Sequence, residues 1–308
     1  MRLLVTAAIA AGAACGLHTA RVGTSAPHET LSAGDVGGLF AALTRRVRAG
    51  GPNHLHCRRL YYYAQTFAPA AGADVGVVSA AAILHDATKE DGSGGAVERF
   101  CTHGFQGAAY ARETLRALGR SDAFADRVAA ATDQHMGPRG WNWRFIDRRF
   151  TSKYCPHEDF PKPTTREAQV LSDIDMLDLM TVDGVVKVVE LRQGPGFAPE
   201  PIRVSAKLGA DSAWKSVIDA SQTLITAPAK RCGRALVAHT ETFLAGIDWS
   251  ETATLDAFEL VAARWVSAHP LPPCLPRVPP LASDQSRACT GTAPQSGVTT
   301  AHPPPSVR

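Results

Sequence analysis

The sequence predicts an all-α protein: a helical bundle with further helices added on its C-terminal side. Through the region from about residue 35 to 267, apolar residues recur at helical offsets, as on one face of a helix. No alternating series indicates strands, and neither internal repeats nor heptads are present. Hydrophobic residues make up 45% of the 308 residues and charged residues 20%, which is enough for a sizeable core.

The expected helices of the N-terminal half each combine an apolar face with a recognisable beginning or end. In one, His56, Leu60 and Tyr63 share a face. Another begins after a cap at Thr102 and stops at Gly119, and a Ser-Asp pair opens the helix after it. The helices expected here cover residues 34–49, 56–68, 74–89, 102–119 and 121–135.

The C-terminal half resumes the helical pattern after a long polar and aromatic loop at residues 136–163. A connection of that length inside a compact body is usually functional or disordered. The helices expected beyond it cover residues 164–180, 212–225, 234–247 and 254–269.

Composition divides the chain into four parts. Residues 1–34 are a leader and a linker, and residues 35–185 form the main helical domain. Residues 186–267 are additional helices packed on the core of that domain. Residues 268–308 are rich in Pro, Ser and Thr without apolar periodicity, which predicts a disordered tail.

The N-terminus has two interpretations. Residues 1–20 contain Arg2 followed by an uncharged, Ala-rich run, as in a secretory signal. The alternative is an Ala-rich leader or a misplaced start codon, in which case the protein would be cytoplasmic. Seven cysteines form no CxxC pair, and the six that remain without Cys15 permit disulfides but do not require them.

Charge narrows the range of partners. The net charge is +3, from 32 basic and 29 acidic residues, which is too balanced to indicate nucleic acid or a membrane surface as the ligand. No apolar stretch in the body reaches the roughly 18–20 residues of a membrane span. These two observations argue against nucleic acid and a membrane as partners, and the oligomeric state is not predicted.

Several expected helices carry polar residues on, or at the end of, an apolar face. Four of them contribute His56, His85 with Asp86, His103 and His135. A fifth contributes Asp173, Asp175 and Asp178. Any single histidine of this kind is usually an ordinary core residue, but burying the whole set unpaired would cost several kcal/mol. A shared divalent metal removes that cost, because it takes neutral imidazoles and ionised carboxylates as ligands.

The order of these residues, H…HD…H…H…D, resembles the HD-domain superfamily of metal-dependent phosphohydrolases. The local contexts are similar too, in "HCRRL", "AAILHDATK", "HGFQGAAYA" and "DIDMLDL". The resemblance covers about residues 50–185. It implies an HD-domain helical bundle with its metal site between the helices, and small residues in the third segment that permit close packing.

The resemblance also implies a ligand set. The first ion would be held by His56, His85, Asp86 and Asp175. A second ion would be held by His103 and His135, with Asp86 bridging the two. Two ions are therefore expected, and nitrogen and oxygen ligands without thiolate suit Mn, Fe, Co, Ni or Mg.

Two of these ligands have a competitor nearby. His54 lies two residues before His56, although helical phase favours His56. Asp173 and Asp175 both flank the apolar stripe of their helix, so periodicity does not choose between them, and the family pattern points to Asp175. Many relatives also have two consecutive histidines where this chain has Gln134 before His135.

Substrate contacts are expected at two places. Lys89, one turn past His85 and Asp86, would join Asp86 as a catalytic residue by reaching a substrate phosphate; the alternative is an exposed lysine. The loop at 136–163 would be a lid whose arginines bind phosphate, or else a solvated loop with its aromatic side chains on the core. The arginines assigned to substrate are Arg144, Arg148 and Arg149.

The expected function is hydrolysis of a nucleotide or another small phosphoester by metal-activated water. One alternative keeps the fold and ligands but uses two irons to activate oxygen, as myo-inositol oxygenase does. The other is a non-catalytic HD-fold module in which the histidines are packing residues.

Overall fold

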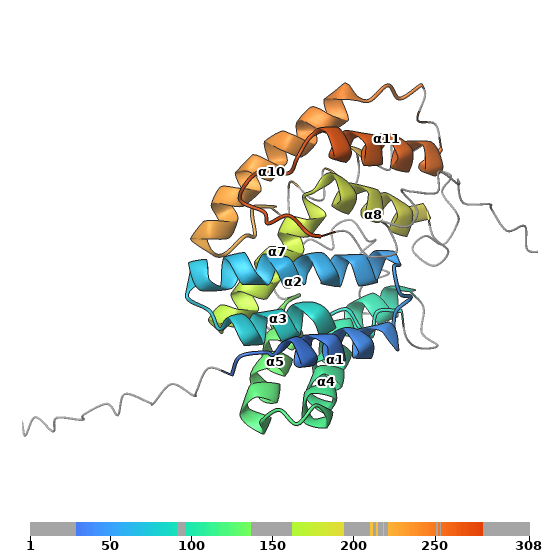
Figure 1. The fold of residues 1–308 in the computed structure, drawn as a ribbon. Coiled ribbons are helices and arrows are strands. Elements are labelled where there is room, and N and C mark those ends of the chain that lie inside the picture. Colours follow the sequence, from blue (N-terminus) through green and yellow to red (C-terminus); the bar gives the residue numbers. More distant parts are fainter. Residues whose placement is uncertain are drawn as a thin grey trace, which may run out of the picture.

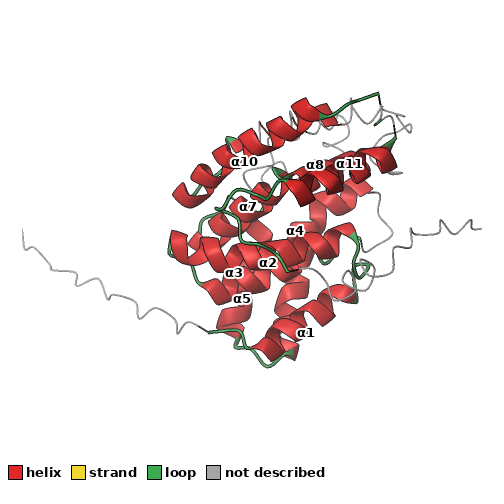
Figure 2. Ribbon diagram, turned by 45° about the horizontal axis from the view of Figure 1, so that its top comes forward, coloured by secondary structure: helices red, strands yellow, loops and turns green. Residues whose placement is uncertain are grey.

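The structure is a computed structural model that describes residues 29–90, 96–136, 162–193 and, with gaps of one to three residues, 210–279. Every regular element in these ranges is a helix (Figures 1 and 2), which confirms the predicted all-α class. The helices are α1 (Ala33–Thr44), α2 (Pro52–Ala71), α3 (Val75–Leu84), α4 (Ala96–Ala117), α5 (Asp122–Gln134), α7 (Arg166–Leu179), α8 (Val182–Gln193), α10 (Ala227–Gly246) and α11 (Leu255–Ala268).

Capping side chains set most of the helix starts. Six helices follow a residue whose side chain accepts a hydrogen bond from the first-turn backbone, namely Ser32, Asp74, Ser121, Thr165, Thr226 and Thr254. The cap predicted at Thr102 is wrong, because α4 already begins at Ala96 and nothing between the two residues breaks a helix. Gly119 follows the end of α4 with φ 74°, as expected of a C-terminal stop.

The main core surrounds α3. Every residue of α3 from Val77 to Leu84 is buried, so this helix is covered on all sides. Its neighbours are α1, α2, α4, α5 and α7, and the Ala-rich sequence lets them approach it closely. The C-terminal end of α3 therefore lies in the interior of the bundle, which is an unusual position for a His-Asp pair.

A second apolar cluster joins α8, α10 and α11, which lie together on one side of the bundle in Figure 1. The long helix α10 belongs to both clusters, with Leu236 in the main core and Phe243 in the second. The sequence did not single out α8, whose valines disfavour a helix in isolation; burial of Val185 in the second cluster offsets that preference. The boundary near residue 185, between domain and additional helices, stays a prediction.

The predicted start of the disordered tail, at residue 268, lies too early in the chain. Residues 269–279 lie on the bundle rather than apart from it: Cys274 forms a disulfide with Cys232 of α10, and Leu275 is buried in the main core. We call this segment the strap. Its prolines prevent a helix but not packing, which is why composition alone misplaced the boundary.

Parts of the chain outside the described residues include 1–28, with the leader, and 280–308. Among the helices that the structure describes, none has the length and apolar character needed to cross a membrane.

Candidate metal centre

His85 and His135 end two helices in the same way. His85 is the C-cap of α3 and His135 the C-cap of α5. In each ring Nδ1 contacts the carbonyl oxygen three residues earlier, which is Ala82 at 3.0 Å for His85 and Thr132 for His135. A carbonyl can only accept, so Nδ1 is the donor in both rings. In the neutral ring, Nε2 therefore presents a lone pair.

His56 is oriented by a carboxylate. Its Nδ1 lies 2.7 Å from Oδ2 of Asp178, and Arg59 donates to the same carboxylate at 2.6 and 2.8 Å. Burial raises the pKa of Asp178, but Arg59, together with His56, outweighs burial and holds that pKa well below its usual range. The ionised carboxylate accepts the Nδ1 proton of His56, which leaves Nε2 of this ring as an acceptor too.

The four residues of the first predicted ligand group meet in one small volume. Nε2 of His56 lies 3.2 Å from Oδ1 of Asp175, and Nε2 of His85 lies 3.5 Å from Oδ1 of Asp86. Nε2 of His56 lies 3.7 Å from Oδ2 of Asp86. The structure thus brings together side chains from α2, the end of α3, and α7.

The two additional histidines complete the cluster. Nε2 of His103, on α4, lies 3.3 Å from Oδ1 of Asp86, and Nε2 of His135 lies 4.0 Å from Oδ2 of Asp175. The two Nε2 atoms are 3.2 Å from each other. All six predicted ligands are therefore buried side by side.

The donor atoms fit a metal ion. Nε2 of His56, Nε2 of His85 and Oδ1 of Asp86 are buried and make no hydrogen bond within the described part of the chain. Leaving such atoms unsatisfied is costly, and a divalent cation would satisfy them together. Two overlapping groups, His56–His85–Asp175 and His85–Asp86–His135, each have ligand atoms within 4.8 Å of one another.

The protonation states of His85 and Asp86 also suit a metal site. Burial lowers the pKa of His85 to about 4, against the opposing effect of Asp86 and Asp175, so the ring is neutral at neutral pH. Burial raises the pKa of Asp86, but the charge of Lys89, together with His85 and His103, outweighs burial. The pKa therefore lies well below its usual range, and the carboxylate is ionised. Neutral imidazole and ionised carboxylate are the forms that bind a metal.

The structure separates each ligand from its competitor. Asp173 points away from the centre and accepts from the backbone N–H groups of Ile225 at 2.7 Å and Thr226 at 2.8 Å, at the start of α10. His54 accepts from the N–H of Gly50 through Nδ1. Of His54 and His56, only His56 lies in the cluster. Of Asp173 and Asp175, only Asp175 does.

The predicted substrate contacts have mixed outcomes. The alternative of an exposed lysine at position 89 is wrong. The Lys89 side chain is mostly buried, and its ammonium lies 2.9 Å from Oδ2 of Asp86. Residues 137–161 lie outside the described residues, so Arg144, Arg148 and Arg149 and the lid stay predictions.

Close helix packing brings α4 to the centre. A Cβ atom at Gly107, one turn after His103, would come within 2.7 Å of the carbonyl oxygen of His85 and 3.3 Å of the Thr132 side chain. Glycine therefore lets α4 lie directly on the ends of α3 and α5. This agrees with the close packing expected of the small residues in "HGFQGAAYA".

The sequence pattern did not identify Arg59 and Asp178 as residues that support the site. Arg59 follows His56 by three positions and Asp178 follows Asp175 by three, so each shares a helix face with a ligand. That spacing was the available signal. Which of the neighbouring charges pair with each other depends on how α2 and α7 pack, and one helix alone does not reveal it.

Comparison with known families agrees with this geometry. A family model described as HD domain matches residues 54–180, from the first turn of α2 through the end of α7. The matched segment, which is similar to an HD domain, contains all six clustered side chains. No curated protein and no solved structure gave a match.

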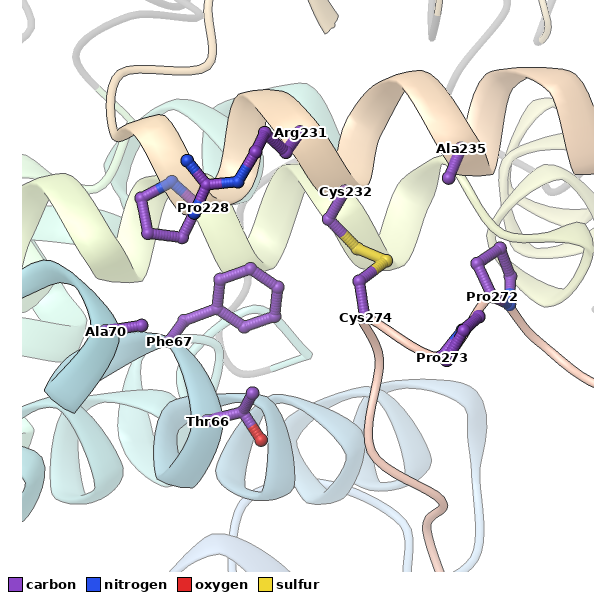
Figure 3. Close-up of a pocket in the computed structure, with 10 residues that line it drawn as sticks. All are labelled: Thr66, Phe67, Ala70, Pro228, Arg231, Cys232, Ala235, Pro272, Pro273 and Cys274. Atoms are coloured by element: carbon purple, nitrogen blue, oxygen red, sulfur yellow. A yellow bond between two sulfur atoms is a disulfide. The ribbon is translucent and has the colours of Figure 1, made fainter.

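A separate pocket of about 300 Å³ lies between the C-terminal half of α2, α10 and the strap (Figure 3). It is lined by Thr66, Phe67, Ala70, Pro228, Arg231, Cys232, Ala235, Pro272, Pro273 and Cys274. Its lining includes the disulfide and one charged side chain, Arg231, but no carboxylate or imidazole. The residue types that bind a metal ion are therefore found in the His/Asp cluster and not in the lining of this pocket.

Proposed function

We propose that this protein is a metal-dependent phosphohydrolase that acts on a nucleotide or another small phosphoester. The observation that carries the proposal is the convergence of four imidazoles and two carboxylates, which are buried with ring nitrogens and carboxylate oxygens 3.2–3.5 Å apart in neighbouring pairs. No thiolate takes part, so Mn, Fe, Co, Ni or Mg suits the site better than structural zinc.

We further propose two ions, with His56, His85, Asp86 and Asp175 around one and His103, His135 and Asp86 around the other. The Asp86 carboxylate lies between the two groups, 3.7 Å from His56 through one oxygen and 3.3 Å from His103 through the other, and this supports a bridging role. Bound divalent ions would supply an activated water and neutralise the phosphate charge.

The protein's own groups prepare the site for that chemistry. Asp178 and Arg59 fix the ring of His56, and backbone carbonyls fix those of His85 and His135. Lys89 holds one oxygen of Asp86, which limits how that carboxylate can turn. The C-terminal ends of α3 and α5, where His85 and His135 are the C-caps, also direct their negative dipole ends toward the His/Asp cluster, which would favour a bound cation.

A phosphoester panel tests the function. Purified protein loaded with Mn²⁺ should release phosphate from at least one nucleotide or small phosphoester, equally well with and without oxygen. The Asp86→Asn variant should lose this activity. Oxygen uptake with tightly bound iron would favour the oxygenase alternative, and a metal-free protein inactive on every substrate would favour the non-catalytic one.

We also propose that the protein folds in an oxidising compartment, with residues 1–20 as a secretory signal. The disulfide between Cys232 and Cys274 supports this, since disulfides persist mainly outside the reducing cytosol. N-terminal sequencing of protein recovered from its native host is the test. Retention of the full leader on protein with reduced cysteines would contradict the proposal.

A further inference from the structure

A buried lysine lies beyond the matched domain. Lys187, on α8, is only 5% exposed. Lysines are almost never buried to this extent unless their charge is paired. Yet within the residues that the structure describes, no hydrogen bond or ion pair holds the Lys187 ammonium.

The junction between α7 and α8 sets the direction of this side chain. A Cβ atom at Gly184 would come within 2.2 Å of the carbonyl oxygen of Asp178 and 2.5 Å of Cα of Leu179, so glycine lets α8 lie against the end of α7. Lys187 follows Gly184 by three residues and shares this face. Val185 belongs to the opposite face, in the second apolar cluster.

The charges acting on Lys187 are those of the metal centre. Burial lowers the pKa of its ammonium to about 8, and Lys89 adds to the effect, while Asp86, Asp178 and Asp175 oppose it. The Lys187 ammonium therefore lies within electrostatic reach of the carboxylates of the His/Asp cluster. Lys89 differs from it in having a carboxylate partner, Asp86, at 2.9 Å.

An ammonium has three donors and no acceptor, and burying it without a partner is unfavourable. Divalent ions at the centre would repel it, whereas an anion bound to those ions would satisfy both charges. We propose that Lys187 is a substrate-binding residue that contacts the anionic phosphoryl group of the substrate. On this basis α8, outside the HD domain, supplies part of the substrate site; the inference rests on the proposed phosphohydrolase function.

Three variants test this role in the full-length, Mn²⁺-loaded protein. Lys187→Met removes the charge at similar size, Lys187→Arg keeps the charge, and Lys230→Met removes a charge from an exposed position on α10 as the control. The measurements are the dissociation constant of inorganic phosphate by calorimetry, the metal content, and KM and kcat for the phosphoester found to be a substrate.

The Lys187→Met variant should keep its metal but bind phosphate about 10- to 100-fold more weakly, as expected for the loss of a charge-assisted hydrogen bond. KM should rise by a similar factor, with a smaller change in kcat. Lys187→Arg should stay within a few-fold of the unsubstituted protein, and Lys230→Met should match it. If Lys187→Met does not fold, Lys187→Gln gives the same comparison.

Unchanged phosphate affinity and KM in Lys187→Met would overturn the inference, as would an unsubstituted protein that binds no phosphate. Failure of the proposed function would look different: no phosphoester would be hydrolysed by any variant. The phosphate titration would then still decide whether Lys187 binds an anion.

Discussion

At the scale of single residues, position along a helix limits what the sequence can reveal. Asp173 and Asp175 are both buried on α7, and both flank the same apolar stripe. Their roles differ because of partners distant in sequence: Thr226 on one side and His56 on the other. The helical pattern alone could identify the carboxylates as candidates, but only packing, or resemblance to a family, could choose between them.

Substitution of these two aspartates separates their roles. Asp175→Ala should abolish stoichiometric metal binding, because it removes a ligand. Asp173→Ala should leave the metal content unchanged but lower the free energy of unfolding by about 1–3 kcal/mol, since two backbone N–H groups at the start of α10, one of them buried, lose their acceptor. Metal analysis and urea denaturation of both variants check this, and the reverse pattern would show that the ligand is misassigned.

His85 should make the metal-free protein sensitive to acid. Burial lowers its pKa to about 4 in the folded state, below the ordinary value of 6.5. As pH falls from about 6.5 to 4, the unfolded chain gains a proton at this position before the folded protein does, so the free energy of unfolding decreases through that window. Above pH 6.5 this contribution is fully present.

Urea denaturation of metal-free protein between pH 7.5 and 4.5 measures this effect. The His85→Gln variant is the control, and its stability should depend less steeply on pH because the titrating ring is gone. Parallel pH profiles for the two proteins would mean that His85 does not titrate as the structure indicates.

At the scale of elements, the sequence predicted helices best where apolar periodicity and a cap coincide. The capped helix starting after Ser121 is an example, with Phe124 donating to the cap as expected. The start of α4 and the whole of α8 were not predicted, since the first lacks a cap signal at Ala96 and the second is rich in valine. Tertiary burial decides such cases, which is also why Lys187 was not noticed.

Close packing of α4 against the centre can be tested with a pair of glycines. Gly107→Ala should lower the free energy of unfolding by about 1–3 kcal/mol and weaken metal binding, because the added methyl group forces α4 away from His85. Gly37→Ala is the matched control on α1: among the described residues, no atom outside the local helix backbone lies within 4 Å of the added Cβ, so the substitution should stabilise the protein by up to about 1 kcal/mol.

Thermal unfolding and metal titration of both variants give the comparison. Equal effects of the two substitutions, in either direction, would show that α4 does not lie against the end of α3 as described.

At the scale of the whole molecule, the strap and its disulfide join parts that the sequence left separate. Six cysteines allow fifteen pairings, and spacing alone does not select among them. In the structure Cys232 and Cys274, 42 residues apart, hold the strap on α10, and Leu275 enters the main core. Composition predicted disorder here because proline-rich segments without periodicity usually lack a packing partner.

Removing this disulfide should destabilise the protein without emptying the metal centre. The Cys232→Ser/Cys274→Ser double variant should lose about 2–4 kcal/mol of unfolding free energy, as is typical for a native disulfide. A reducing agent should destabilise the unsubstituted protein by a similar amount and leave the double variant unaffected. Metal content should not change, because no centre residue lines the pocket beside the disulfide. Identical denaturation curves for all samples would contradict the presence of the bond.

The central claim is that His56, His85, Asp86, His103, His135 and Asp175 form a metal-binding centre. The most direct measurement is metal analysis of the purified protein beside its Asp86→Ala variant, with folding of both verified by circular dichroism. The predicted result is one or two equivalents of a divalent metal in the unsubstituted protein and a large loss in the variant. A folded protein that binds no divalent metal at any tested concentration, or an Asp86→Ala variant that retains its full metal content, would contradict the claim.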